Sequence, residues 1–341
     1  MNFEPWYNEN YKKLLIIPAV LLALSLIYIG IFYIQTGDII NKDVSLTGGT
    51  TISIFTDISS VDVESALSKT LTDFNVQTIS NNAGNQLQLV ITIGEEQTEA
   101  LKVALEEFLG EELTSENSSE ESTSAALSAD FYKQLIIAVL LAFFWMAAVV
   151  FLIFAKGKKV KTWTIIFNVL LGFFMGNFFL TINPVLAGII FLAFAAILIR
   201  IYIKNSVPSF AVMLSAFADI VMTLAVVNLL GIKLSTAGIV AFLMLIGYSV
   251  DTDILLTSRI LNRKHGGINQ ELFGAFKTGT TMTLTSIIAI TAALIVVYPF
   301  GSVLNQIFVI LLIGLGFDLF NTWVTNASII KWYASDSLST K

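Results

Sequence analysis

Four aspartates lie within long apolar segments of this sequence, where charged side chains are otherwise rare: Asp219, Asp251, Asp253 and Asp318. A charge at the centre of a membrane-spanning helix costs about 2.5–3.5 kcal/mol on insertion scales. Four such costs would not be tolerated against lipid. We therefore expect the carboxyl groups to point into a helix bundle, toward one another, water or a cation.

The candidate cation is Lys277, which stands just before the apolar run that starts at Met282. Thr281 and Thr285 follow it at four-residue spacing, so the three side chains share one helix face. Burial favours the neutral form of a carboxyl group, and a nearby ammonium group favours the charged form. Aspartates clustered with a lysine could therefore share a proton and pass it on. In the alternative interpretation, these groups only join helices through hydrogen bonds worth about 0.6 kcal/mol each.

Asp251 and Asp253 cannot lie on the same face of a helix, because two residues correspond to a rotation of about 200°. Asp251 shares its side with Tyr248 and Ser258, whereas Asp253 shares its side with Thr257. We expect one of the two aspartates to face a partner helix and the other to face the centre of the assembly.

The composition indicates an integral membrane protein. The chain has 341 residues, of which 55% are hydrophobic and 13% are charged, whereas soluble proteins carry about 25% charged residues. It contains no cysteine, and its one histidine, His265, stands in a basic loop, so no disulfide, zinc or haem site is expected. Residues 274–278 hold a Lys-Thr pair without the spacing of a nucleotide-binding loop. We therefore expect no enzyme, no cofactor, no metal and no nucleic-acid partner.

Eight apolar segments are long enough to span a bilayer, which takes about 20 helical residues. The first is too long for a signal-peptide core of about 7–15 residues, so we interpret it as an uncleaved span. The basic residues gather in those loops that are cytoplasmic if both termini are cytoplasmic. The predicted spans are residues 14–34, 134–154, 163–180, 185–203, 210–230, 237–257, 282–298 and 304–330.

Residues 35–130 are polar and hold 17 of the 25 acidic residues. Alternating and β-branched patterns predict strands, and apolar stripes predict helices. Their order, βαββα, suggests a small α+β domain of the ferredoxin-like, split-βαβ type on the extracytoplasmic side. We expect the Ser- and Glu-rich residues 111–128 to be a solvated tether. The expected strands are 50–55, 76–80 and 86–92, with a hairpin turn at 81–84, and the expected helices are 61–74 and 98–109.

Several segments carry a resemblance to a known family. Residues 43–55, DVSLTGGTTISIF, contain the paired glycines Gly48 and Gly49 just outside the first span. The others are VPSFAVMLSAFADIVMTLAVVNLLGI (207–232), IGYSVDTDILLTSRIL (246–261), AFKTGTTMTLTS (275–286) and IGLGFDLFNTW (313–323). Together they resemble the SecD/SecF family of protein-export membrane proteins, archaeal SecF in particular, within the RND superfamily.

The resemblance implies a polytopic α-helical protein of the cell membrane with an RND-type bundle. It implies a subunit that works with SecD beside the SecYEG channel, among membrane lipids, and uses the proton motive force to promote export of unfolded polypeptides. It also implies proton-conducting roles for Asp251 and Lys277, and more weakly for Asp253. Asp219 and Asp318 depend on the burial argument alone. The alternatives are a proton-driven exporter of small molecules or lipids, and a passive scaffold of the translocon.

One departure from the family is the stretch between the second span and Ser206. The family has six spans, so residues 156–205 are expected to be an inserted membrane hairpin, either a lipid-facing one or a partner contact. The expected organisation is an N-terminus with the first span (1–34), the extracytoplasmic domain with its acidic linker (35–130), the second span (131–155), the inserted hairpin (156–205) and a four-helix bundle (206–341).

Overall fold

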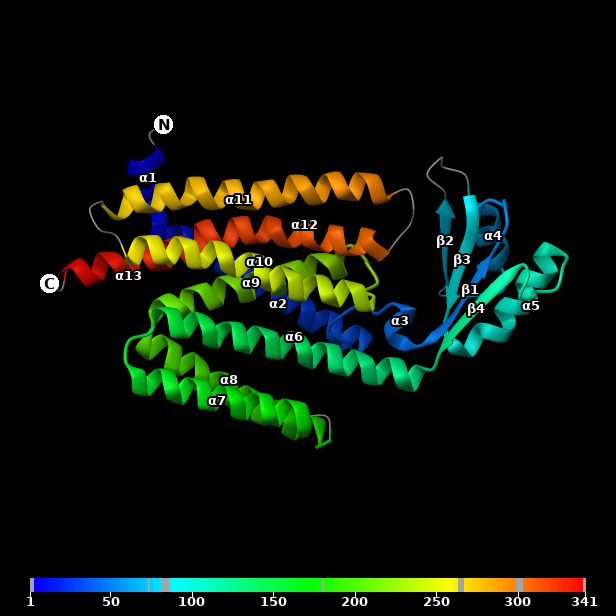
Figure 1. The fold of residues 1–341 in the computed structure, drawn as a ribbon, viewed down its shortest axis with the longest axis horizontal. Helices are drawn as coiled ribbons and strands as arrows, with labels where there is room; N and C mark the ends of the chain where they lie inside the picture. Colours follow the sequence, from blue (N-terminus) through cyan, green and yellow to red (C-terminus); the bar gives the residue numbers. More distant parts are fainter. Residues whose placement is uncertain are drawn as a thin grey trace.

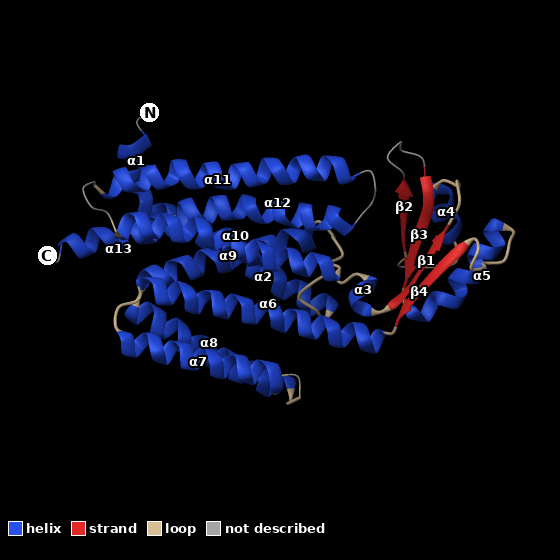
Figure 2. Cartoon of the chain, in the orientation of Figure 1, coloured by secondary structure: helices blue, strands red, loops and turns tan. Residues whose placement is uncertain are grey.

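The computed structural model describes residues 3–72, 74–80, 86–179, 181–262, 267–298 and 303–339. Long helices form a single bundle, and a small antiparallel sheet with its own helices stands at one end of it (Figures 1 and 2). Both chain termini lie at the opposite end of the bundle (Figure 1).

Seven helical stretches of the described chain are long and apolar enough to cross a membrane. Helices α9 and α10 are the most buried of these stretches, whereas α2 and α11 expose most of their surface. The bundle interior is therefore built around α9, α10 and α12. The helices of the bundle are α1 (Phe3–Leu14), α2 (Ile16–Thr36), α6 (Ala125–Phe154), α7 (Lys158–Asn177), α8 (Pro184–Asn205), α9 (Val207–Leu229), α10 (Thr236–Leu261), α11 (Ile268–Val297), α12 (Val303–Asn321) and α13 (Ala327–Ser339).

The predicted span 163–180 corresponds to α7, which is not one of those seven stretches. Lys158, Lys159 and Lys161 occupy its first turn and lower its hydropathy. The structure thus yields seven clear spans where eight were expected. Its 20 residues still form a helix of about 30 Å, at about 1.5 Å per residue, which matches the thickness of the bilayer core.

Helices α7 and α8 form a hairpin along the outside of the bundle, with α7 beside α6 and α8 beside α9 (Figure 1). Aromatic rings fill the contact. Phe151 of α6 stacks on Tyr202 of α8 with ring centres 4.7 Å apart, and Phe144 meets Phe191 edge-on at 5.5 Å. Such pairs add directional packing to the burial of apolar area, so the hairpin is a packed part of the bundle.

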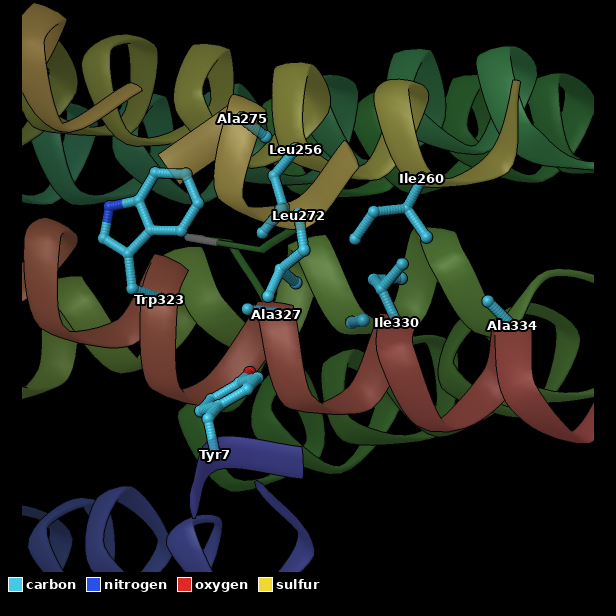
Figure 3. Close-up of a cluster of buried hydrophobic side chains, with 10 residues drawn as sticks. Tyr7, Leu256, Ile260, Leu272, Ala275, Trp323, Ala327, Ile330 and Ala334 are labelled. Atoms are coloured by element: carbon cyan, nitrogen blue, oxygen red, sulfur yellow. The ribbon is translucent and has the colours of Figure 1, made fainter. Parts of the chain in front are cut away.

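At the terminal end of the bundle, a buried apolar cluster joins α1 to α10, α11 and α13 (Figure 3). Tyr7 of α1 belongs to this cluster, and the Lys331 ammonium group of α13 lies 4.6 Å from the centre of its ring. The same ammonium group lies 4.9 Å from the Tyr11 ring. These cation–π contacts hold the first and last helices of the chain together.

The sheet has the strand order β2-β3-β1-β4 with antiparallel neighbours throughout. Its core side chains come from both the sheet and the helices that cover one face, and Leu89, Ile91 and Leu101 are fully buried. The three predicted strands and the helix predicted over 98–109 are confirmed, and the helix predicted over 61–74 is present but ends at Leu67. The predicted turn at 81–84 lies outside the described residues. The elements are α3 (Val44–Thr47), β1 (Gly49–Ile54), α4 (Ser60–Leu67), β2 (Asn75–Ser80), β3 (Gln86–Ile93), η1 (Glu95–Gln97), α5 (Thr98–Leu109) and β4 (Ser118–Thr123).

The prediction of a solvated tether over 111–128 is wrong, because β4 is a fourth strand paired with β1. Its side chains are mostly exposed, so it lacks the apolar alternation that marks a strand in a sequence. Backbone pairing holds it instead, together with an ion pair of 3.0 Å between Lys102 of α5 and Glu120. The hydrogen bond to Glu120 raises the pKa of Lys102. With β4 the order becomes βαββαβ, which completes the ferredoxin-like arrangement.

Gly48 and Gly49 lie where the sheet meets the bundle. Gly48 adopts φ +86°, and a Cβ there would lie 2.4 Å from Cα of Ala125, the first residue of α6. A Cβ on Gly49 would lie 2.2 Å from the carbonyl oxygen of Ile93. Only glycine permits both the conformation and the close approach. Gly48 therefore lets the chain pass directly over the start of α6, and Gly49 lets β1 begin close to the end of β3.

Candidate functional site

Three of the four intramembrane aspartates meet in the bundle interior. Asp219 of α9, Asp253 of α10 and Asp318 of α12 each have an exposed fraction of 0%. Their helices pack against one another in all three pairings. The expectation that these carboxyl groups point into the bundle is confirmed for these three.

Asp219 is held by donors from two neighbouring helices. Ser249 of α10 donates its hydroxyl to Asp219 Oδ2 at 2.5 Å, and Asn321 at the end of α12 donates its amide to Oδ1 at 2.7 Å. Since each oxygen has one neutral donor from a different helix, this carboxyl group ties α9 to both α10 and α12.

Asp253 is held on one side only. The side-chain amide of Asn326 donates to Asp253 Oδ1 at 2.8 Å and to its backbone oxygen at 3.3 Å. Asp253 Oδ2 is buried and makes no well-aligned hydrogen bond in the described part of the chain, although the Ser215 and Thr322 hydroxyls lie near the carboxyl group. A buried acceptor without a partner is costly, so this oxygen is the natural position for a proton or an incoming donor.

Asp318 is held by two hydroxyl groups. Thr322 donates to Oδ1 at 3.2 Å, and Thr283 of α11 donates to Oδ2 at 3.4 Å. Both distances are long for hydrogen bonds between oxygens, whose usual range is about 2.5–3.0 Å. The contacts to this carboxyl group are therefore weaker than those to Asp219.

Asp251 lies on the opposite side of α10 from this cluster. It is exposed, as is Tyr248 at 42%. The expectation that all four aspartates point into the bundle is therefore wrong for Asp251. The expectation that Asp251 and Asp253 lie on different faces is confirmed, with Asp253 inside and Asp251 outside.

Lys277 does not join the buried carboxyl groups. It is exposed on α11 and forms no ion pair with them in the described structure. Thr281 and Thr285 share its face, as the spacing predicts, and each donates its hydroxyl to the backbone oxygen four residues earlier, at 2.7 and 2.6 Å. The sequence predicted one cluster of aspartates with a lysine. In the structure, Asp219, Asp253 and Asp318 form a buried cluster, whereas Asp251 and Lys277 are exposed.

The sequence interpretation missed the neutral donors of the cluster. Asn321 and Asn326 carry the two shortest amide contacts to the carboxyl groups, and Ser249 carries the shortest hydroxyl contact. A signal was present, because residues 321–326 place four amide or hydroxyl side chains in six positions of an otherwise apolar helix. Neutral polar residues in a membrane helix need partners just as charged ones do.

Comparisons with known proteins place the chain among protein-export components. The family model described as "Protein export membrane protein SecD/SecF, C-terminal" matches residues 176–336, a range that includes all four intramembrane aspartates. The match begins near the end of α7 and takes in α8, so residues 176–205 of the expected insertion lie within it.

Among the similar proteins is the protein-export membrane protein SecF of Methanocaldococcus jannaschii, which is 34% identical over 333 residues. That alignment covers 96% of this chain and 97% of the relative. SecF of Methanothermobacter thermautotrophicus is 46% identical over 143 residues, which are 41% of this chain and 50% of that one.

A solved structure has the same fold. The crystal structure of SecDF from Thermus thermophilus, described as a translocon-associated membrane protein, superposes with a TM-score of 0.57 at 14% identity. The match covers 98% of this chain but 39% of the SecDF chain. This chain therefore spans about two fifths of the length of that protein.

Proposed function

This chain belongs to the SecF family of protein-export membrane proteins, and we propose that it is the proton-coupled SecF subunit of a Sec translocation machinery. In this role it works with SecD beside the SecYEG channel and acts on unfolded polypeptides during export. It uses the free energy of the proton gradient to drive conformational changes. It performs no covalent chemistry of its own, so it is a transport component and not an enzyme.

The observation that carries the proposal is the cluster of Asp219, Asp253 and Asp318. All three are fully buried, and their hydrogen-bond donors are neutral hydroxyl and amide groups. Like charges in a medium of low dielectric constant repel strongly, and no described cation offsets them. Such a cluster is tolerable when protons neutralise part of it. Exchange of those protons with the two sides of the membrane would alter the contacts between α9, α10 and α12.

The exposed face of α10 and α11 supports the proposed partner. Asp251 lies in the middle of an apolar helix, where no element of the described chain covers it, and exposed apolar side chains such as Met244 lie on the same helix. A carboxyl group facing lipid at this depth is unfavourable. We infer that SecD covers this face, which also carries Lys277, and that the remaining length of the SecDF chain corresponds to such a second half.

The proposed topology places both termini in the cytoplasm and the sheet domain on the extracytoplasmic side. The termini and the sheet domain lie at opposite ends of the bundle (Figure 1). The connection between α6 and α7 lies at the terminal end; it contains Lys156, and Lys158 and Lys159 follow it in the first turn of α7. Basic loops remain preferentially in the cytoplasm.

The test is protein export into membrane vesicles that contain the purified complex with SecD and the channel. Asp253→Asn preserves size and removes the titratable group, so we expect it to abolish the stimulation of export by a proton gradient while SecD remains bound. Asp57→Asn in the sheet domain is the matched control, because Asp57 is exposed and far from the bundle interior.

The outcome also separates the alternatives. A passive scaffold would keep full stimulation with Asp253→Asn. A proton-driven exporter of small molecules or lipids would show gradient-dependent efflux of a dye or lipid probe from the same vesicles, with protein export unaffected by the variant.

A further inference from the structure

The helix that carries Asp318 contains one wide turn beside the carboxyl cluster. Residues Thr322–Asn326 form a π-helical turn between α12 and α13, and the backbone N–H of Ala327 donates to the oxygen of Thr322, five residues earlier. In a regular α-helix with about 3.6 residues per turn, residues five apart are rotated by about 140°. A turn closed by bonds between residues five apart brings them to nearly the same face.

Asn321 and Asn326 stand at the two ends of this wide turn and are five residues apart. The first amide reaches Asp219 of α9 at 2.7 Å, and the second reaches Asp253 of α10 at 2.8 Å. In an uninterrupted α-helix, one of the two amides would point away from the cluster. The wide turn therefore permits one helix to hold two carboxyl groups on two other helices at once.

The two amides are not held equally. Thr325 donates its hydroxyl to Asn321 Oδ1 at 3.1 Å, which directs the amide NH₂ of Asn321 toward Asp219. Asn326 Oδ1 is buried and has no hydrogen-bond partner among the residues that the structure describes. The Asn321 amide is oriented by its own helix, whereas the Asn326 amide is oriented by α10, through Asp253 and Thr257.

We propose that Asn321 and Asn326 are positioning residues of the proton-binding cluster, and that the π-helical turn between them sets the geometry in which Asp219 and Asp253 are held together. A hydrogen bond to a charged carboxylate is stronger than one to a neutral acid. Protonation of Asp219 weakens its contact with Asn321, and protonation of Asp253 weakens its contact with Asn326. The protonation state of the two aspartates is thereby transmitted to α13, which follows the wide turn. This inference rests on the proposed function and adds a positioning device to its site.

The groups that face the cluster are known on each element packed against it. They are neutral or acidic throughout the described residues: Ser215 and Asp219 on α9, Ser249, Asp253 and Thr257 on α10, Thr283 on α11, and Asp318 and Thr322 on the α12 helix and its wide turn.

The experiment measures how readily each carboxyl group reacts with dicyclohexylcarbodiimide, a reagent for protonated carboxyl groups in apolar surroundings. Labelling of Asp219 and of Asp253 is quantified by mass spectrometry of the full-length protein in its complex, as a function of pH. Asn326→Leu should displace the pH at which labelling of Asp253 is half-maximal by about one unit, which corresponds to a tenfold change in proton affinity. Asn321→Leu should do the same at Asp219.

Asn168→Leu on α7 is the matched control. Asn168 is also a buried asparagine of the bundle, with 2% exposed, but its amide donates to Thr164 of its own helix. This variant should leave both midpoints unchanged. The proposal would be overturned if Asn168→Leu displaced the midpoints as much as Asn326→Leu does. It would also be overturned if neither Asn321→Leu nor Asn326→Leu displaced them.

A deletion tests the wide turn itself. Removing Val324 makes the two asparagines four residues apart, a spacing that an ordinary α-helix places on one face. Both midpoints should then remain near those of the unaltered protein, whereas displacement of both would overturn the inference that the turn serves to align the amides. Labelling does not depend on export, so loss of this result and loss of the proposed transport role can be told apart.

Discussion

The two sides of α10 carry aspartates two residues apart that meet opposite environments. Asp253 faces α9 and α12, is fully buried and has a neutral amide as its partner. Asp251 faces outward, on the same side of its helix as the exposed Tyr248. The inner cluster is complete within this chain, whereas the outer face is not. Under the proposed function, the chain supplies its own proton-binding cluster, and a second membrane subunit covers the other aspartate.

Besides Asp253→Asn, the largest expected effect comes from removing the carboxyl group of Asp318 from the inner cluster. Asp318→Leu should reduce gradient-stimulated export by at least tenfold, because it changes the charge that Asp219 and Asp253 must share. Association with SecD should persist, as Asp318 lies inside the bundle. Export rate and co-purification are measured on the same preparation. Equal loss of both would show that the inner cluster only stabilises the fold.

The outer face should show the reverse pattern. Asp251→Asn should weaken the association with SecD by about 2–5 kcal/mol, the usual effect of removing one member of a buried charged pair at an interface. The bundle of the isolated chain should unfold at the same temperature as before, because Asp251 is exposed there. Titration of SecD in detergent measures the affinity. Unchanged affinity would mean that another surface, or lipid, meets this aspartate.

Lys277→Gln should act in the same direction with a smaller effect. Its flexible side chain can extend toward polar surroundings at the end of the apolar segment, which lowers the cost of leaving it without a partner. The same SecD titration applies, with Lys69→Gln in the sheet domain as the control. If Lys277→Gln instead abolished gradient-stimulated export with SecD bound, the lysine would belong to the proton path, as the family resemblance implies.

The smallest expected effects separate two threonines on α11. Thr283 is buried and donates to Asp318, so Thr283→Val should lower the free energy of unfolding by about 1 kcal/mol. Thr281 is exposed and bonds to its own helix, so Thr281→Val should change it by less than about 0.5 kcal/mol. Thermal unfolding of the two variants in detergent provides the comparison. Equal effects would remove the distinction between the inner and outer faces of this helix.

Helix periodicity was sufficient to predict the opposite placement of Asp251 and Asp253, since the rotation between them is fixed by the backbone. It could not tell which of them faces inward, because that depends on where α9 and α12 pack. Nor could spacing along α11 show that Lys277 faces away from the cluster. Residue spacing predicts which side chains share a face of a helix, but it does not predict which element packs against that face.

Two further features were beyond the sequence for different reasons. Strand β4 was missed because its pairing with β1 uses backbone groups, which leave no pattern in the Ser- and Glu-rich residues. The asparagines at 321 and 326 were missed because only charged residues were considered as unfavourable in the membrane. In an α-helix they would also lie on different faces, so their joint role depends on the π-helical turn, which residue spacing does not reveal.

The most direct test of the account is whether the buried carboxyl groups change protonation at all. Difference infrared spectroscopy of the membrane-embedded complex between acidic and alkaline pH detects the C=O stretch of a protonated carboxyl group. The account predicts a band that appears on acidification in the unaltered protein, is altered by Asp253→Asn and is unaffected by Asp57→Asn. A band that is identical in the unaltered protein and in Asp253→Asn, or that does not respond to pH, would contradict it.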